Sequence, residues 1–248
     1  MRYRAGSTRW AVLILAAAFA AGAAGCRGFG AASGNFERTL AVTGPVHLEV
    51  QNGSGRVQVR PGEAGQVRIR GEVRVHTWFS EDAQSRLNEI LAHPPIEQKG
   101  NLIQITYEKL KFLSLSVNYT IDVPPQTELQ AAVGSGNIDV RGIEGPATLT
   151  AGSGSIQAAA VAKEVQATAG SGGLTLEELG DDVRATAGSG AITISRIRGD
   201  VRALAGSGTI DIREPAARVT AKAGSGSVTV RGASADLRAL TGSGSITI

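Results

Sequence analysis

Apolar and polar residues alternate with a period of two along most of this chain, and the alternating stretches return at a fixed interval. Numbered from the first glycine of a recurring Gly-Ser-Gly, positions 5 and 7 carry mainly Ile, Val or Leu, and positions 14, 16 and 18 form a second alternating stretch. This alternation predicts two strands per unit, each with one buried face. The Gly-Ser-Gly triplets, all 18 residues apart, are 134–136, 152–154, 170–172, 188–190, 206–208, 224–226 and 242–244.

Strand signals fill each unit between its glycines and leave no room for a helix of useful length. Units of equal length can satisfy their backbone groups by stacking on one another. The repeat therefore predicts an all-β fold, a parallel β-solenoid with 18-residue rungs about 4.8 Å apart. The pattern leaves the handedness of the solenoid open.

The repeated glycines are expected at tight corners, because glycine adopts positive φ without steric cost. Stacked corners would place one serine per rung in a column. Their hydroxyls are expected to bond to the backbone or to one another, and contact with a ligand is the alternative. The column contains Ser135, Ser153, Ser171, Ser189, Ser207, Ser225 and Ser243.

The region 36–130 has the same alternation in a less regular form. Strands are expected at 46–50, 57–59, 67–75, 102–107 and 113–123, and Gly53-Ser54-Gly55 repeats the later motif. A short helix is expected at about 80–92, with Ser80 as N-cap and Pro94-Pro95 as its stop. We interpret 36–130 as the irregular N-terminal part or cap of the solenoid, with the helix packed on the rod or over its end. Residues 131–248 are the regular repeat.

The N-terminal 25 residues have the layout of a secretory signal peptide. Arg2, Arg4 and Arg9 precede an uncharged run from 10 to 24. This run is shorter than the about 20 apolar residues that span a bilayer comfortably.

Cys26 follows small residues directly and is the only cysteine in the chain. The arrangement resembles a bacterial lipobox, which implies cleavage before Cys26 and lipid attachment to it. Ala23 stands where Leu is usual, so cleavage by signal peptidase I after Ala23 stays open. Residues 26–35 would then form the lipidated cysteine and a flexible tether.

Charge changes the picture once the signal is removed. The chain has 25 basic and 22 acidic residues, and the three signal arginines leave without any acid, so the remaining chain is formally neutral. Nucleic acid is not expected as a partner, because binding to it depends on many Lys and Arg contacts with phosphates. One cysteine also excludes an intramolecular disulfide framework.

No catalytic, cofactor or metal site is predicted. His47, His76 and His93 have no cysteine partners and no ligand spacing, and no Gly-x-Ser-x-Gly elbow occurs. Polysaccharide-active β-helix enzymes are the main enzymatic alternative, but they need clustered acids and aromatic platforms for sugars. No aromatic residue follows Tyr119. Trp78, Phe79, Tyr107, Phe112 and Tyr119 are interpreted as a small core between helix and solenoid, with a partner-binding patch as the alternative.

An alternating strand pair around Gly-Ser-Gly, a short helix, an Ile-Asp-Val-Pro-Pro stretch at 121–125 and the regular rungs resemble the bacterial putative-adhesin family of β-strand-repeat proteins. The resemblance covers about residues 40–248. It implies a solenoid domain of envelope-associated proteins and brings no catalytic residues.

We therefore expect a non-enzymatic adhesin or surface scaffold, exported to the cell envelope. A lipid anchor would hold it on the membrane, the outer one if the host has two. An accessory or sensing module for envelope membrane proteins is the alternative. The apolar last strand further predicts end-to-end self-association through Ile246 and Ile248.

Overall fold

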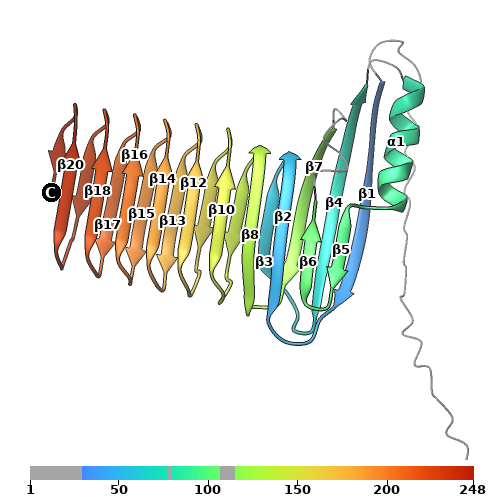
Figure 1. The fold of residues 1–248 in the computed structure, drawn as a ribbon, viewed down its shortest axis with the longest axis horizontal. Helices are drawn as coiled ribbons and strands as arrows, with labels where there is room; N and C mark the ends of the chain where they lie inside the picture. Colours follow the sequence, from blue (N-terminus) through green and yellow to red (C-terminus); the bar gives the residue numbers. More distant parts are fainter. Residues whose placement is uncertain (1–29, 78–79, 107–114) are drawn as a thin grey trace, which may run out of the picture.

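Two sheets form the walls of a rod, with strands of 18-residue rungs stacked along its length (Figure 1). The computed structural model describes residues 30–77, 80–106 and 115–248, and over these residues the protein is a parallel β-solenoid with one short α-helix. The predicted fold class is confirmed. The predicted signal peptide and Cys26 lie outside the described residues.

The regular part of the rod alternates strands between the two sheets. Its apolar positions point inward and are buried, as the alternation predicts. Its strands are β8 (Thr127–Ser135), β9 (Ile138–Arg141), β10 (Ala147–Ala151), β11 (Ile156–Ala159), β12 (Val165–Ala169), β13 (Leu174–Leu179), β14 (Val183–Ala187), β15 (Ile192–Ile197), β16 (Val201–Ala205), β17 (Ile210–Pro215), β18 (Val219–Ala223), β19 (Val228–Arg231), β20 (Leu237–Thr241) and β21 (Ile246–Thr247).

Register within both walls follows the repeat. Each residue of β11 pairs in parallel with the residue 18 positions later in β13, as Ile156 does with Leu174. In the other wall, Val165 of β12 pairs in the same way with Val183 of β14. We call the wall that contains the odd-numbered strands from β9 to β21 sheet A. The wall that contains the even-numbered strands from β8 to β20 is sheet B.

The reason why the Gly-Ser-Gly corners require glycine differs from the one predicted. From Gly134 onward, none of the glycines in these triplets has positive φ. Instead, the rungs stack so closely at this corner that a side chain would collide with the backbone of the rung before. A Cβ on Gly152 would lie 2.5 Å from the carbonyl oxygen of Gly134, and one on Gly190 would overlap the carbonyl group of Gly172. Close backbone approach, not backbone conformation, therefore requires glycine here.

Positive φ occurs once per rung at the opposite corner, at position 9 of the repeat. Four of the six residues there are not glycine, so each holds a left-handed conformation at some cost in strain. The column consists of Gly142, Ala160, Glu178, Arg196, Glu214 and Gly232.

The N-terminal part contributes one more rung, which lies between strands that come later in the chain. Its strands are β2 (Val46–Ser54) and β3 (Val57–Pro61), and Ser54 pairs in register with Ser135. On its other side lie β6 (Leu102–Ile105) and β7 (Leu115–Val123), which pair with β2 and β3 respectively. The rung 46–61 is thus enclosed between later parts of the chain.

Antiparallel strands close this end of the rod. In sheet A, β4 (Gln66–Thr77) pairs with β7, and β1 (Gly30–Ala41) pairs with β4. In sheet B, β5 (Ile96–Lys99) pairs with β6. The helix α1 (Ser80–Ala92) has the predicted bounds and packs on β1 and β4 (Figure 1).

Residues 30–35, expected in a flexible tether, belong instead to β1. Their small side chains serve packing against the helix. A Cβ on Gly34 would lie 2.7 Å from Cδ1 of Leu91 and 3.4 Å from Cδ2 of Leu87. Small residues here let α1 approach the strand closely, and composition alone cannot distinguish this from flexibility.

Candidate functional site

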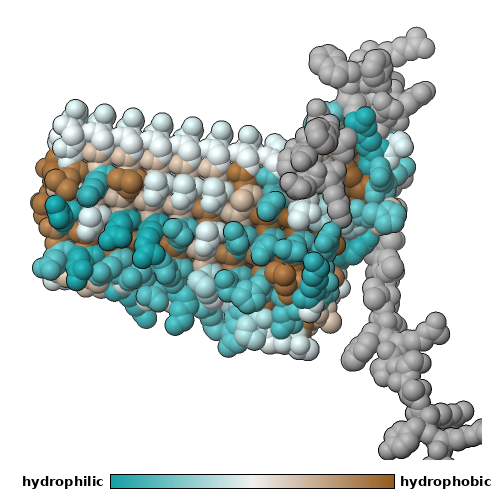
Figure 2. All heavy atoms as spheres, in the orientation of Figure 1, coloured by the Kyte–Doolittle hydropathy of each residue, from teal (hydrophilic) through white to brown (hydrophobic). Residues whose placement is uncertain are grey.

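The serine column is an exposed ridge along one edge of the rod. Figure 2 shows the ridge as a regular row of residues of intermediate hydropathy along the upper edge. Backbone bonds hold each corner: the N–H of Ser153 donates to the carbonyl of Gly134 at 3.0 Å, and the same bond links Ser207 to Gly188 at 2.9 Å. The serine side chains are exposed. The ridge is therefore a row of small, uncharged groups in contact with solvent.

The outward face of sheet A carries charges of both signs that form ion pairs. Arg213 Nη2 lies 2.6 Å from Asp211 Oδ2, and this interaction raises the pKa of Arg213. At the position-9 corner, Arg196 Nη2 lies 3.0 Å from Glu178 Oε1 of the rung before. Side chains on this face largely neutralise one another.

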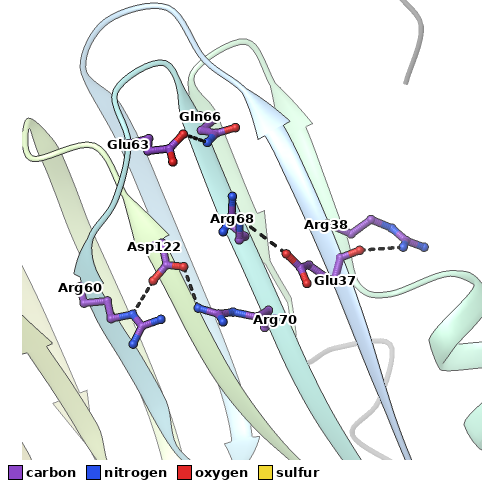
Figure 3. Close-up of polar contacts among 8 residues, drawn as sticks. All are labelled: Glu37, Arg38, Arg60, Glu63, Gln66, Arg68, Arg70 and Asp122. Carbon is purple, nitrogen blue, oxygen red and sulfur yellow. Dashed lines mark hydrogen bonds and ion pairs between the residues drawn. The ribbon is translucent and has the colours of Figure 1, made fainter. Parts of the chain in front are cut away.

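A polar cluster lies where the parallel rungs meet the antiparallel cap (Figure 3). Asp122 of β7 is only 15% exposed and lies between two arginines from the neighbouring strands. Its Oδ1 accepts from Nε of Arg60 on β3 at 2.5 Å, and its Oδ2 accepts from Nη2 of Arg70 on β4 at 2.8 Å. Hydrogen bonding to Asp122 raises the pKa of Arg60.

Beside this cluster is a shallow pocket of ≈ 250 Å³, which Arg60, Pro61, Gly62, Glu63, Gln66, Arg68 and Asp122 line. The guanidinium groups of Arg60 and Arg70 occupy both oxygens of the Asp122 carboxylate. Among the residues that the structure describes, no serine, cysteine or histidine lines this pocket to act as a nucleophile. The arrangement is best suited to joining β3, β7 and β4.

Of the predicted aromatic group, only Tyr119 lies within the described residues. It is buried, and its ring meets Phe36 edge to face with centroids 6.3 Å apart. Burial raises the pKa of the Tyr119 hydroxyl. Tyr119 is therefore a core residue, while Trp78, Phe79, Tyr107 and Phe112 lie outside the described residues.

The histidines come from separate places in the fold. His47 Nδ1 lies 3.0 Å from Glu128 Oε2 on the surface of sheet B. Within residues 30–77, 80–106 and 115–248, no three His, Cys, Asp or Glu side chains meet in a group that could hold a metal ion. In the same ranges, no helix is both long enough and apolar enough to cross a membrane.

Sequence reasoning missed two surface features. Asp122 was seen only as part of the Ile-Asp-Val-Pro-Pro stretch, because its arginine partners come from two distant strands. The outward cations of sheet B, including Arg202 and Arg238, were also missed. The 18-residue spacing places them in one column and could have revealed them.

Comparison with protein families matches residues 46–248 to the family described as Toastrack DUF4097. The match runs from the first residue of β2 to the end of the last rung, so it covers both the enclosed rung and the regular repeat. The chain belongs to the Toastrack DUF4097 family. A comparison with curated proteins gives no match.

Solved structures similar to this chain come from several bacteria. A putative adhesin from Bacteroides fragilis has a TM-score of 0.51 at 16% identity, over 86% of this chain and 96% of that one. A putative adhesin from Parabacteroides merdae has a TM-score of 0.41 at 9% identity, over 86% and 96%. At such identities, the likeness to the B. fragilis protein shows a common fold alone.

Proposed function

We propose that this Toastrack protein is a non-enzymatic scaffold of the bacterial cell envelope that presents a rigid surface for adhesion. The observation that carries the proposal is the unbroken stack of rungs of equal length, which repeats the same outward positions along both walls. A solenoid of this kind forms an extended binding surface from small contributions per rung. Most of its charged groups that the structure describes in contact form ion pairs within a strand or between neighbouring strands, and they do not form a reactive site.

The relatives and the N-terminus support an envelope location. Solved proteins with this architecture are described as putative adhesins, and one from Clostridium sporogenes as a putative cell adhesion protein. The sequence layout before Cys26 favours export and a lipid anchor. On this proposal the anchor holds the N-terminal end of the chain at a membrane.

Retention on cell-wall or host-surface material tests the scaffold role. Full-length protein should be retained on this material. The triple substitution Thr175→Glu, Thr193→Glu and Thr229→Glu on sheet A should reduce retention if sheet A is the wall that contacts the material. The matched control places Glu at Thr150, Thr168 and Thr186 on sheet B. Absence of retention together with co-purification of one membrane protein would favour an accessory or sensing module. Cleavage of a polysaccharide by the purified protein would overturn the non-enzymatic assignment.

Acyl labelling in cells tests the anchor. Cys26→Ala should abolish incorporation of labelled fatty acid and release the protein from membranes. Cys26→Ser is the matched control for thiol loss at nearly constant size and should behave in the same way. Membrane retention that both variants leave unchanged would contradict lipid anchoring.

A further inference from the structure

Six outward residues on three adjacent strands of sheet B form a patch of basic and aliphatic side chains. Register pairs Arg202, Thr220 and Arg238 along one column of β16, β18 and β20, and Leu204, Lys222 and Leu240 along the next. We call these six residues the Arg–Leu patch. They belong to the end of the face in Figure 2 where strongly hydrophobic and strongly hydrophilic residues alternate.

The three cations of the patch are unpaired. Arg202, Lys222 and Arg238 make no ion pair with any other residue that the structure describes, whereas sheet A pairs Arg213 with Asp211. Asp200, two residues before Arg202, accepts instead from the amide of Arg218 at 3.2 Å. Arg202 pairs in register with Arg184 of β14, but Arg184 forms an ion pair with Glu164, so the unpaired charge in this column begins at Arg202.

The two leucines are exposed at positions where earlier rungs carry threonine. Leu204 is 47% exposed and Leu240 is 43% exposed, and Lys222 lies between them in the register. Thr150, Thr168 and Thr186 occupy the same column in earlier rungs. Aliphatic groups beside unpaired cations are the composition of surfaces that dock on anionic lipid.

We propose that the Arg–Leu patch docks on the surface of an anionic phospholipid bilayer. The cations would contact lipid phosphates, and the leucines would enter the boundary between headgroups and acyl chains. A soluble polyanion would engage the cations but leave both leucines in water, so the pair of features favours a bilayer.

The surroundings of the patch decide which edge faces the lipid. The uncharged Gly-Ser-Gly ridge borders the column of Leu204 and Leu240, because Gly206 and Gly242 follow these leucines within two residues. The acidic residues Glu164, Asp182, Asp200 and Asp236 precede the strands at the opposite edge of sheet B. The rod would therefore meet the membrane with its ridge side and keep its acidic side away.

The docking is weak by itself and becomes effective through a tether. Each Lys or Arg near an anionic membrane contributes about fivefold in affinity, so three contribute about 100-fold. A tether raises the effective concentration of a weak site to the millimolar range. This step rests on the proposed lipid anchor. With both contacts, the rod lies along the membrane instead of standing away from it.

Site-specific fluorescence on vesicles tests the orientation. The full chain would carry one introduced cysteine, at Thr220→Cys on sheet B or at the matched Thr229→Cys on sheet A, in a Cys26→Ser background. Because this background cannot be acylated, an N-terminal histidine tag bound to a nickel-chelating lipid in the vesicles would supply the tether. Each variant would be labelled with an environment-sensitive dye and mixed with phosphatidylcholine vesicles, with or without phosphatidylglycerol. Co-pelleting would verify that every variant is bound to the vesicles. The dye at residue 220 should shift to the blue and be quenched by spin-labelled lipid only when phosphatidylglycerol is present. The dye at residue 229 should not respond.

Two sets of variants separate the possible occupants. The triple substitution Arg202→Ser, Lys222→Ser and Arg238→Ser should abolish the fluorescence response at residue 220. The double substitution Leu204→Ser and Leu240→Ser should remove the quenching by spin-labelled lipid. If the leucine variant leaves quenching unchanged, the patch binds charge alone and the bilayer proposal is wrong. Equal responses at residues 220 and 229 would also overturn it. If the dyes respond equally while the chain with Cys26 unchanged is still acylated in cells, the anchor stands and only the docking is rejected.

Discussion

The ring of Phe36 on β1 occupies the space that a side chain at Gly71 on β4 would need. The two residues pair directly across the antiparallel strands, and a Cβ on Gly71 would overlap the edge of the ring. On its other side, Gly71 pairs with Tyr119 of β7, whose ring packs edge to face on Phe36 at 6.3 Å. The two aromatic residues thus cover a glycine within a strand and compensate for its missing side chain.

A double-mutant cycle tests this relationship. Gly71→Ala should lower the free energy of unfolding by about 1–3 kcal/mol through overpacking, and Phe36→Ala should lower it by about 3–5 kcal/mol through lost burial. In the double variant, the alanine methyl fills part of the vacated space, so the total loss should be smaller than the sum. Urea denaturation measures all three. Strict additivity would show that the ring does not restrict residue 71.

Two substitutions separate the reasons for glycine at the two corners. Gly190→Ala should destabilise the protein by about 3 kcal/mol, because the new Cβ would collide with the backbone of Gly172. Ala160→Gly should instead stabilise it by up to about 1 kcal/mol, because Ala160 has a φ of 54°. Thermal and urea unfolding of both variants measure the signs. If Gly190→Ala lost no stability, the close-approach explanation would be wrong. If Ala160→Gly lost stability, the left-handed conformation at residue 160 would carry no strain.

Asp122 is expected to matter more for stability than a similar surface carboxylate. Asp122→Asn should cost about 1–2 kcal/mol, because it leaves Arg60 and the part-buried Arg70 without their counter-charge. Asp211→Asn removes a comparable but exposed pair with Arg213 and serves as the matched control, for which no measurable change is expected. Equal effects in urea denaturation would assign no special role to the junction between β3, β7 and β4.

Tyr119 should make the fold sensitive to alkaline pH. Burial raises the pKa of its hydroxyl above the ordinary value of 10.0, so the unfolded chain loses this proton at a lower pH than the folded one. Stability is therefore intact below about pH 10 and falls above it, by at most about 1.4 kcal/mol per pH unit. Tyr119→Phe should show a shallower loss between about pH 9 and about pH 11. An unchanged slope in urea titrations would exclude Tyr119 as the cause.

Self-association through the last rung is a further expected outcome. Within the described residues, β20 and β21 each have one unpaired edge, and Ile246 is 43% exposed although its register partner Val228 is fully buried. An open apolar edge favours pairing with another strand. Sedimentation of the full chain should show dimers that Ile246→Lys dissociates, whereas Thr247→Lys, an outward residue, should change little. A monomer at all concentrations would contradict the proposal.

The regular rungs were predictable because glycine, serine and apolar residues recur at constant positions of the 18-residue unit. Strand order, register and the inward positions of residues such as Ile156 and Leu174 all follow from that period. The helix was predictable from local signals at Ser80 and Pro94. Each of these features depends on residues close together or at a constant spacing.

The features that were missed depend on contacts between distant residues. Small residues around Gly34 are compatible with a flexible tether until Leu87 and Leu91 are placed against them. The corner glycines are compatible with positive φ until the distance to the next rung is known. The cluster at Asp122 combines residues from β3, β4 and β7, which no local pattern connects.

The enclosed position of the rung 46–61 sets an order of folding. Its strands β2 and β3 find their parallel partners only in β6, β7, β8 and β9, so this rung cannot be completed until about residue 140 has emerged. These pairings have large sequence separation and are slow to form. Each later rung needs only the preceding rung as a template, so the rungs can add one after another. The protein should thus fold by a slow nucleation near its N-terminal end, followed by rapid growth toward Ile248.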